Sequence, residues 1–297
     1  DAEVVRQGLG GHREVSVLDT LAWHSKHMRY ALGKPRLLGG RAYKLKGYFS
    51  DKFCRDDEHE PHLGAVIAEL LRRREGAFID IGVNVGQTLC KFLATGDKRR
   101  YIGFEPQIAC CFYVDQFIRH NGIADAHVIP VALGEEPGVL ELFADNDDVD
   151  ESASFDASGF RATMSATRKV LVPVLRGDTA IAQLRLEKIA VLKIDVEGAE
   201  LDVLRGLPDT LGLWKPPVMF EVLPNFFGAE RKPIDARLAA EHNHRAEAIF
   251  EFFTTHGYSV HQVNHAGGWS PIDAFKLDDR EGFVTWDYLA LPRDAKE

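Results

Sequence analysis

The sequence predicts an α/β protein with a doubly wound, mostly parallel β-sheet. From about residue 60 onward, short apolar runs alternate with amphipathic segments, which is the pattern of βαβ units. The runs 189–194 and 217–222 are almost continuously apolar, as expected of parallel strands that are buried on both faces. A chain of 297 residues suits one large domain. We therefore expect a single domain over 60–297, preceded by an N-terminal extension over 1–59.

The expected elements alternate along the chain. An alternating stretch at 41–48 indicates a short strand, and apolar residues on one face of 60–74 predict a helix. The further strands are expected at 77–81, 101–105, 127–131, 139–143, 171–174, 189–194, 217–222, 258–262 and 286–291. The further helices are expected at 88–95, from Pro106 onward, at 201–207 and at 236–256, the last capped by Gly257.

The composition argues against some classes of binding partner and indicates a cellular compartment. The net charge is −9 and the pI about 5.8, which argues against nucleic-acid binding because that depends on phosphate neutralisation by Lys and Arg. The four cysteines form no CxxC pair, so we expect no disulfide framework and a cytoplasmic location. No run of 18 apolar residues is present, so no membrane span is expected.

A glycine-rich turn follows the expected strand at 77–81. Asp80 near the end of the strand and Gly82, Asn84 and Gly86 in the turn stand at alternate positions, and glycine lets the backbone approach a ligand closely. The spacing is GxxxG rather than the GxGxxG of dinucleotide sites. A nucleoside cofactor without a pyrophosphate, such as S-adenosylmethionine (SAM), suits this looser turn better, although a βα turn without ligand has the same pattern.

An acidic residue ends the next expected strand. Glu105 lies 25 residues after Asp80, where a carboxylate can accept hydrogen bonds from both hydroxyls of a ribose. NAD sites and SAM sites share this feature. An ordinary surface glutamate remains the alternative interpretation.

Three further carboxylates follow the two most apolar strands. Asp195 and Glu197 come just after 189–194, and Glu221 ends 217–222. Asp195 or Glu197 could orient an acceptor hydroxyl or take its proton, whereas Glu197 could instead only favour the N-terminus of the next helix. Asp80, Glu105, Asp195 and Glu221 are expected at the ends of four different strands, and carboxylates that converge at one sheet edge are costly unless they serve a ligand or a metal. The sequence requires no metal, although Asp195 and Glu221 could hold a divalent ion.

These residues occur within motifs that resemble the FkbM-type family of SAM-dependent methyltransferases. The resemblance runs from about residue 60 to residue 291. The motifs that carry it are Phe78-Ile-Asp-Ile-Gly-Val-Asn-Val-Gly86, Gly103-Phe-Glu-Pro106, Val131-Ala-Leu-Gly134, Leu192-Lys-Ile-Asp-Val-Glu-Gly-Ala-Glu200 with Val203-Leu-Arg-Gly206, and Pro217-Val-Met-Phe-Glu-Val222. One departure is Val83, where the family usually has alanine.

The resemblance implies a Rossmann-like fold of the class I methyltransferase type and a role for each matched residue. The methionine and ribose end of SAM would be cradled by Asp80, Gly82, Asn84 and Gly86. Glu105 would hold the ribose hydroxyls, and Val131 and Ala132 would line the adenine. Asp195 and Glu197 would face the methyl group and the acceptor.

The expected function is therefore SAM-dependent O-methylation of a hydroxyl on a small molecule, namely a sugar or a glycosylated product. Two alternatives stay open, an NAD-dependent oxidoreductase on a similar fold and a nucleoside-binding protein without activity. Amino-methyltransferases of nucleic acids need a (D/N)PP(Y/F) motif after the fourth core strand, where this chain has Asp-Val-Glu-Gly.

Overall fold

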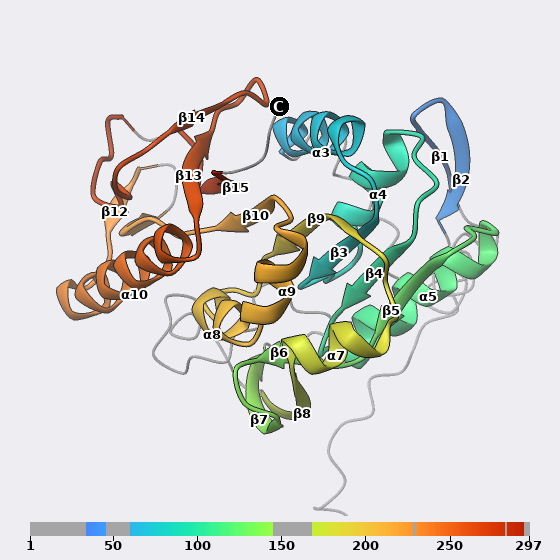
Figure 1. The fold of residues 1–297 in the computed structure, drawn as a ribbon, viewed down its shortest axis with the longest axis horizontal. Coiled ribbons are helices and arrows are strands. Elements are labelled where there is room, and N and C mark those ends of the chain that lie inside the picture. Colours follow the sequence, from blue (N-terminus) through green and yellow to red (C-terminus); the bar gives the residue numbers. More distant parts are fainter. Residues whose placement is uncertain (1–33, 46–59, 145–167, 228–229, 283, 294–297) are drawn as a thin grey trace, which may run out of the picture.

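An eight-stranded mixed sheet forms the centre of the computed structural model, which describes residues 34–45, 60–144, 168–227, 230–282 and 284–293 (Figure 1). The strand order is β14-β13-β15-β10-β9-β3-β4-β5. The strands are β3 (Ala77–Ile81), β4 (Tyr101–Phe104), β5 (Ala126–Ile129), β9 (Ile189–Ile194), β10 (Val218–Glu221), β13 (Tyr258–Val263), β14 (Trp269–Pro271) and β15 (Asp287–Pro292). The strands from β10 to β5 pair in parallel, and β15, β13 and β14 are antiparallel additions.

Helices cover both faces of this sheet, so the predicted doubly wound arrangement is confirmed. One face packs against α3 (Pro61–Arg73), α4 (Gln87–Ala94) and α5 (Ile108–His120). The other face packs against α7 (Gly177–Gln183), α8 (Glu200–Arg205), α9 (Pro208–Trp214) and α10 (Ala236–Thr255). Each face buries its own apolar cluster, and the central strands β3 and β9 are buried along their whole length, as parallel strands between two helix layers must be.

Local signals account for where the long helices begin. Proline is tolerated in a helix's first turn because its missing N–H has no helical partner there, and α3 starts at Pro61. The N-cap of α10 is Asp235, whose carboxylate accepts hydrogen bonds from the backbone N–H groups of Arg237 and Leu238. In both helices the apolar residues form one stripe that faces the sheet.

The direction of winding reverses between β3 and β9. From β3 the chain proceeds to β4 and β5 on one side, and later returns to β9 and β10 on the other side. In open α/β sheets, ligands bind in the crevice outside the carboxyl ends of the strands at this point of reversal. The turn at 82–86 and the carboxylates after β9 both lie at this edge.

The first described hairpin belongs to the apolar core, although its sequence lies within the expected extension. It consists of β1 (Lys34–Leu38) and β2 (Arg41–Leu45). Leu38 and Tyr43 are buried against α4 and α5, and the Tyr43 and Phe117 ring centroids are 6.0 Å apart. The boundary at 59 stays a prediction, and the rest of the extension, 1–33 and 46–59, lies outside the described residues.

The expected strand at 127–131 ends earlier than predicted, and a separate strand in a different sheet follows it. β5 ends at Ile129, and after Pro130 the chain forms β6 (Ala132–Gly134). Proline lacks the N–H that a ladder needs, which explains the break. β6 joins a three-stranded sheet of order β6-β8-β7 with β7 (Gly138–Ala144) and β8 (Arg168–Arg176). A two-stranded hairpin of β11 (Phe226–Phe227) and β12 (Lys232–Pro233) completes the strands.

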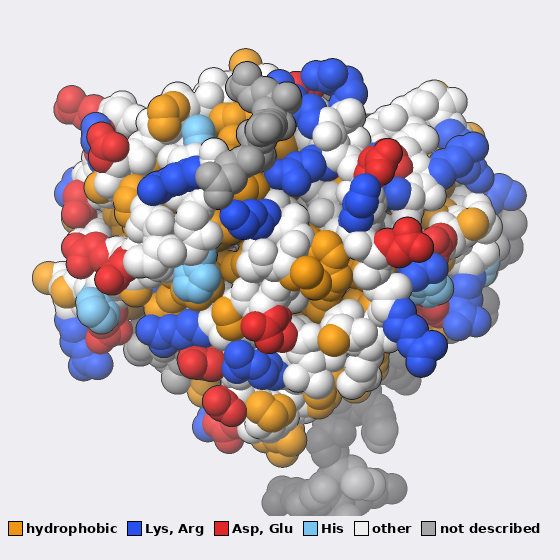
Figure 2. All heavy atoms as spheres, in the orientation of Figure 1, with side chains coloured by type: hydrophobic (Ala, Val, Ile, Leu, Met, Phe, Trp, Pro, Cys, Tyr) orange, Lys and Arg blue, Asp and Glu red, His pale blue; other side chains and the backbone are white. Residues whose placement is uncertain are grey.

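The visible surface carries acidic and basic side chains interspersed with each other (Figure 2). Several large apolar side chains are exposed on β7 and β8, among them Val139 and Leu171. Within the described part of the chain, no helix combines the length and apolar character that crossing a bilayer would need.

Candidate cofactor and acceptor site

The turn after β3 is shaped by glycine at two positions. Gly82 has φ of 93°, and a methyl group on it would lie 1.7 Å from the carbonyl oxygen of Asp195. Gly86 has φ of 90° and is the N-cap of α4. These conformations are strained for any residue with a side chain. Gly82 therefore allows the ends of β3 and β9 to meet, and brings the expected cofactor turn against the expected acceptor side.

Glu105 is held at the end of β4 by two backbone donors. The N–H of Asn84 donates to Oε2 at 2.7 Å, and the N–H of Gln107 donates to Oε1 at 2.8 Å. Burial raises the pKa of Glu105 to about 7, against the lowering effect of these two hydrogen bonds. Each carboxylate oxygen has a second lone pair, so the group can still accept hydrogen bonds from a diol.

Asp80 lies directly behind the turn. Its side chain is completely buried, and it accepts a hydrogen bond from the hydroxyl of Tyr101 through Oδ2. Burial raises its pKa to about 6, and the positive charge of Lys193 opposes that rise. The other oxygen, Oδ1, is buried without a hydrogen-bond partner among the described residues, so it can accept one from a bound group or a water.

These features fit the polar parts of SAM. Glu105 can accept hydrogen bonds from the ribose hydroxyls. The glycines of the turn allow the cofactor to approach the backbone closely, and Oδ1 of Asp80 can accept one further hydrogen bond. Val131 follows β5 at the same edge of the sheet, and Ala132 is buried at the start of β6. The individual cofactor contacts of these residues stay predictions.

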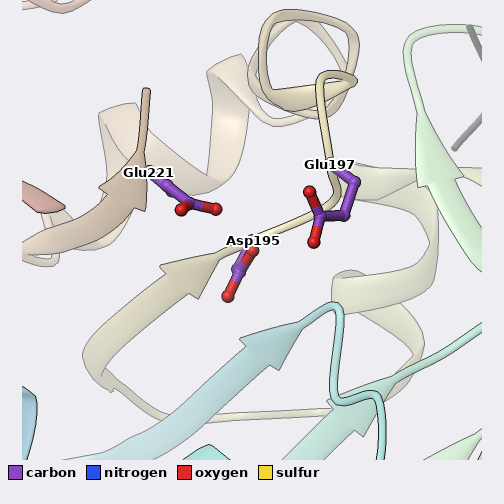
Figure 3. A group of neighbouring side chains, drawn as sticks. All are labelled: Asp195, Glu197 and Glu221. Atoms are coloured by element: carbon purple, nitrogen blue, oxygen red, sulfur yellow. The ribbon is translucent and has the colours of Figure 1, made fainter. Parts of the chain in front are cut away.

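Three carboxylates meet at the ends of β9 and β10. Asp195 directly follows β9, Glu197 lies in the turn after it, and Glu221 ends β10 (Figure 3). They offer oxygen atoms that all lie within 4.8 Å of one another. A divalent cation could bridge such oxygens, and so could the hydroxyl groups of an acceptor. The sequence prediction that these residues converge is confirmed by the structure, while their roles stay predictions.

The turn between β9 and α8 directs Glu197 toward this space. Glu197 has φ of 55° and Gly198 has φ of 104°. Glu200, in the first turn of α8, accepts hydrogen bonds through Oε1 from the N–H groups of Val196 and Gly198 at 3.3 and 3.1 Å. Glu200 thus stabilises the turn from behind.

Lys193, which was not among the expected site residues, compensates part of the negative charge of this cluster. Its Nζ donates to Asp195 Oδ2 at 2.7 Å. Burial disfavours the ammonium charge, but Asp195 and Asp80 outweigh it and raise the pKa of Lys193 well above its usual range. A lone charged residue within the apolar strand 189–194 was the available signal.

Helix α10 supplies two more side chains that sequence reasoning missed. His242 and Arg245 line a small pocket together with Gly198 and Glu221. A methyl group on Gly198 would lie 3.0 Å from Arg245 Nη1, so the glycine admits the guanidinium. No sequence signal could have found these residues, because their place depends on how α10 crosses the sheet.

In this protein a glycine-rich turn and a carboxylate at a strand end meet where the winding of a doubly wound sheet reverses. This arrangement is typical of α/β proteins that bind a nucleoside cofactor at the point of reversal. Residues 80–260 match the sequence profile of the methyltransferase FkbM domain. This match covers more than half of the chain, so the protein belongs to the FkbM methyltransferase family, and SAM is its cofactor.

Two curated proteins that are similar to parts of this chain are also named as methyltransferases. "Methyltransferase 1" of Beauveria bassiana is 28% identical over 145 residues, covering 44% of this chain and 58% of its own. Hexuronic acid methyltransferase AglP of Haloferax volcanii is 25% identical over 167 residues, covering 54% of this chain and 63% of its own. The chain thus spans about three fifths of the length of these curated relatives.

Among solved structures, a methyltransferase FkbM from Methylobacillus flagellatus is similar with a TM-score of 0.40 and 16% identity, covering 73% of this chain and 43% of its own.

Proposed function

We propose that the protein transfers the methyl group of SAM to a hydroxyl of a sugar or glycosylated acceptor. The observation that carries this proposal is the cluster of Asp195, Glu197 and Glu221. It adjoins the cofactor turn, since Gly82 contacts the backbone of Asp195. The proposed acceptor-binding and cofactor-binding groups are thus adjacent at one edge of the sheet.

When bound, SAM supplies a methyl group that is already strongly electrophilic. The protein then has to align one acceptor oxygen and receive one proton. Asp195 or Glu197 would accept the hydroxyl proton, a contribution of about 10²–10⁴ in rate. Alignment of the acceptor can contribute a further ~7–11 kcal/mol.

Two features favour a polyhydroxylated acceptor. Ionised carboxylates only accept hydrogen bonds, so three of them suit a partner that presents several hydroxyl donors. The named substrate of the archaeal relative is a hexuronic acid, and Arg245 at the neighbouring pocket is a group that can bind a carboxylate.

The test is a transfer assay with SAM carrying a labelled methyl group. The acceptors would be hexuronic-acid oligosaccharides, neutral glycosides and simple primary amines, with mass spectrometry to locate the added methyl. We expect an O-methyl ether on a sugar. Label on nitrogen or carbon, or transfer to no hydroxyl compound by a protein that binds S-adenosylhomocysteine (SAH), would overturn the proposal.

Domain roles and location form part of the same proposal. We infer from the sequence alone that the extension over 1–59 contributes to the acceptor site; its residues 1–33 and 46–59 lie outside the described part of the chain. A cytoplasmic location is proposed from the cysteine pattern of the sequence, and fractionation of cells would test it.

A further inference from the structure

Lys193 is an unusual residue for its position. It lies in β9, whose six residues are otherwise apolar, and only 6% of it is exposed. A buried ammonium group is costly unless carboxylates and hydrogen bonds compensate it. The strand therefore carries a charge that packing alone does not explain.

Two carboxylates on opposite sides of the site flank this lysine. Its Nζ lies 2.7 Å from Asp195 Oδ2 on the acceptor side. In the β3–β9 register Lys193 is paired directly with Asp80, which lies behind the cofactor turn. One cation thus lies between the cofactor half and the acceptor half of the site.

The contact with Asp195 restricts how that carboxylate can turn. Asp195 is about one-third exposed at 36%, whereas the side chain of Lys193 is 7% exposed and enclosed by the sheet. A fixed donor on one oxygen fixes the plane of the whole carboxylate, and therefore the direction in which the other oxygen points. Partners of this indirect kind commonly change activity about 10–100-fold when removed.

We propose that Lys193 is a positioning residue that orients Asp195 for the acceptor while compensating the buried charge of Asp80 behind the cofactor turn. The statement that Asp195 faces an acceptor rests on the proposed function, whereas the orientation of Asp195 by Lys193 does not. It acts through both carboxylates and touches neither reactant.

The test compares Lys193→Met, Lys193→Arg and the double variant Asp80→Asn/Lys193→Met with Asp80→Asn alone. Lys188→Met is the matched control, because Lys188 pairs with Glu75 on the surface just before the same strand. For each variant we would measure the melting temperature, the affinity for SAH by calorimetry, and the position of Asp195 in a crystal structure.

We expect Lys193→Met to displace the Asp195 carboxylate and to weaken SAH binding about tenfold or more, as loss of a buried partner commonly does, with partial recovery in Lys193→Arg. The double variant lacks both buried charges, so its melting temperature should be higher than that of Lys193→Met, whereas the Asp195 carboxylate should stay displaced. With any hydroxyl acceptor that the transfer assay identifies, the double variant should have a lower kcat than Asp80→Asn, at a similar acceptor KM.

An Asp195 that keeps its position in Lys193→Met, together with SAH affinity within about twofold of the wild type, would overturn the proposal. Recovery of both stability and Asp195 geometry in the double variant would also overturn it, since it would show a purely structural role. If instead no hydroxyl acceptor is methylated but Asp195 still moves, the proposed function fails and the role of Lys193 stands.

Discussion

At the scale of single residues, the ionisation of the buried carboxylates in the site is set by opposing effects of burial and of hydrogen bonds or charges around them. Glu105 is buried yet accepts two backbone hydrogen bonds, so its charged form is favoured by geometry and disfavoured by burial. The balance of these effects raises its pKa to about 7. Its charge therefore changes within the physiological range of pH.

We predict that SAH binding weakens as the pH falls from 8 to 5.5. If Glu105 binds the ribose hydroxyls as expected, its ionised form accepts them, so protons compete with the ligand below the raised pKa, at up to about tenfold per pH unit. Calorimetry across this range measures the effect. Glu105→Gln should bind more weakly and with a smaller slope, the remainder arising from Asp80, whose pKa of about 6 also lies in this range, whereas an equal slope in that variant would assign the titration to another group.

The acceptor-side carboxylates give a second prediction. Asp195→Asn or Glu197→Gln should lower kcat by about 10²–10⁴, the usual contribution of a general base or orienting group. SAH affinity should change much less. Glu75→Gln, at an exposed surface glutamate, is the matched control. Full turnover in both site variants would remove these residues from the mechanism.

Much of the residue-level site could be predicted from the sequence, because polar residues that end buried strands meet at one sheet edge. Asp195, Glu197 and Glu221 were predicted this way and do converge. Lys193 and Arg245 were missed, since one lies within a strand and the other on a distant helix. Their places depend on strand register and helix crossing, which local sequence does not specify.

At the scale of elements, the junction of β3 with β9 determines whether the two halves of the site meet. Gly82→Ala should destabilise the protein by at least about 1–3 kcal/mol, the usual cost of overpacking, because its methyl group would overlap the Asp195 carbonyl. SAH binding should fall with it. Denaturant unfolding and calorimetry measure the two effects.

Gly212→Ala is the matched control for Gly82→Ala. Gly212 lies within α9, and a methyl group there meets nothing within 4 Å. We expect this variant to gain about 0.5–1 kcal/mol from helix propensity. Equal effects of the two substitutions would contradict the account of the β3–β9 junction.

The helices α3 and α10 followed from hydrophobic period and the central strands from their apolar runs, whereas α7 and α9 did not follow from either. The expected strand at 189–194 has the observed bounds of β9. Helices α7 and α9 have only seven residues each, so neither completes enough turns to reveal a period. The signal for α9 was Pro208 at its start, and the signal for the end of β5 was Pro130.

At the scale of the whole molecule, the β1–β2 hairpin packs into the apolar core, although its sequence lies within the predicted N-terminal extension. Its residues alternate too briefly to indicate what they pack against. Tyr43 nevertheless contacts Phe117 of α5, and the N–H of Lys44 donates to Asn121 at 2.6 Å. The hairpin thus contributes to the folded state of the cofactor-binding half.

We therefore predict that Tyr43→Ala destabilises the protein by about 3–5 kcal/mol, the usual cost of removing a buried aromatic side chain. Leu37→Ala, in the same hairpin but 68% exposed, should change stability by no more than about 0.5 kcal/mol. Denaturant unfolding measures both. A small effect of Tyr43→Ala would make the hairpin a dispensable part of the extension.

The central claim is that the turn after β3 and the carboxylate of Glu105 form a SAM site. Calorimetric titration of the protein with SAH and with NAD, in parallel, tests it most directly. We predict micromolar binding of SAH, none of NAD, and loss of SAH binding in Gly82→Ala. Binding of NAD with no binding of SAH would contradict the account and would favour an oxidoreductase on the same fold.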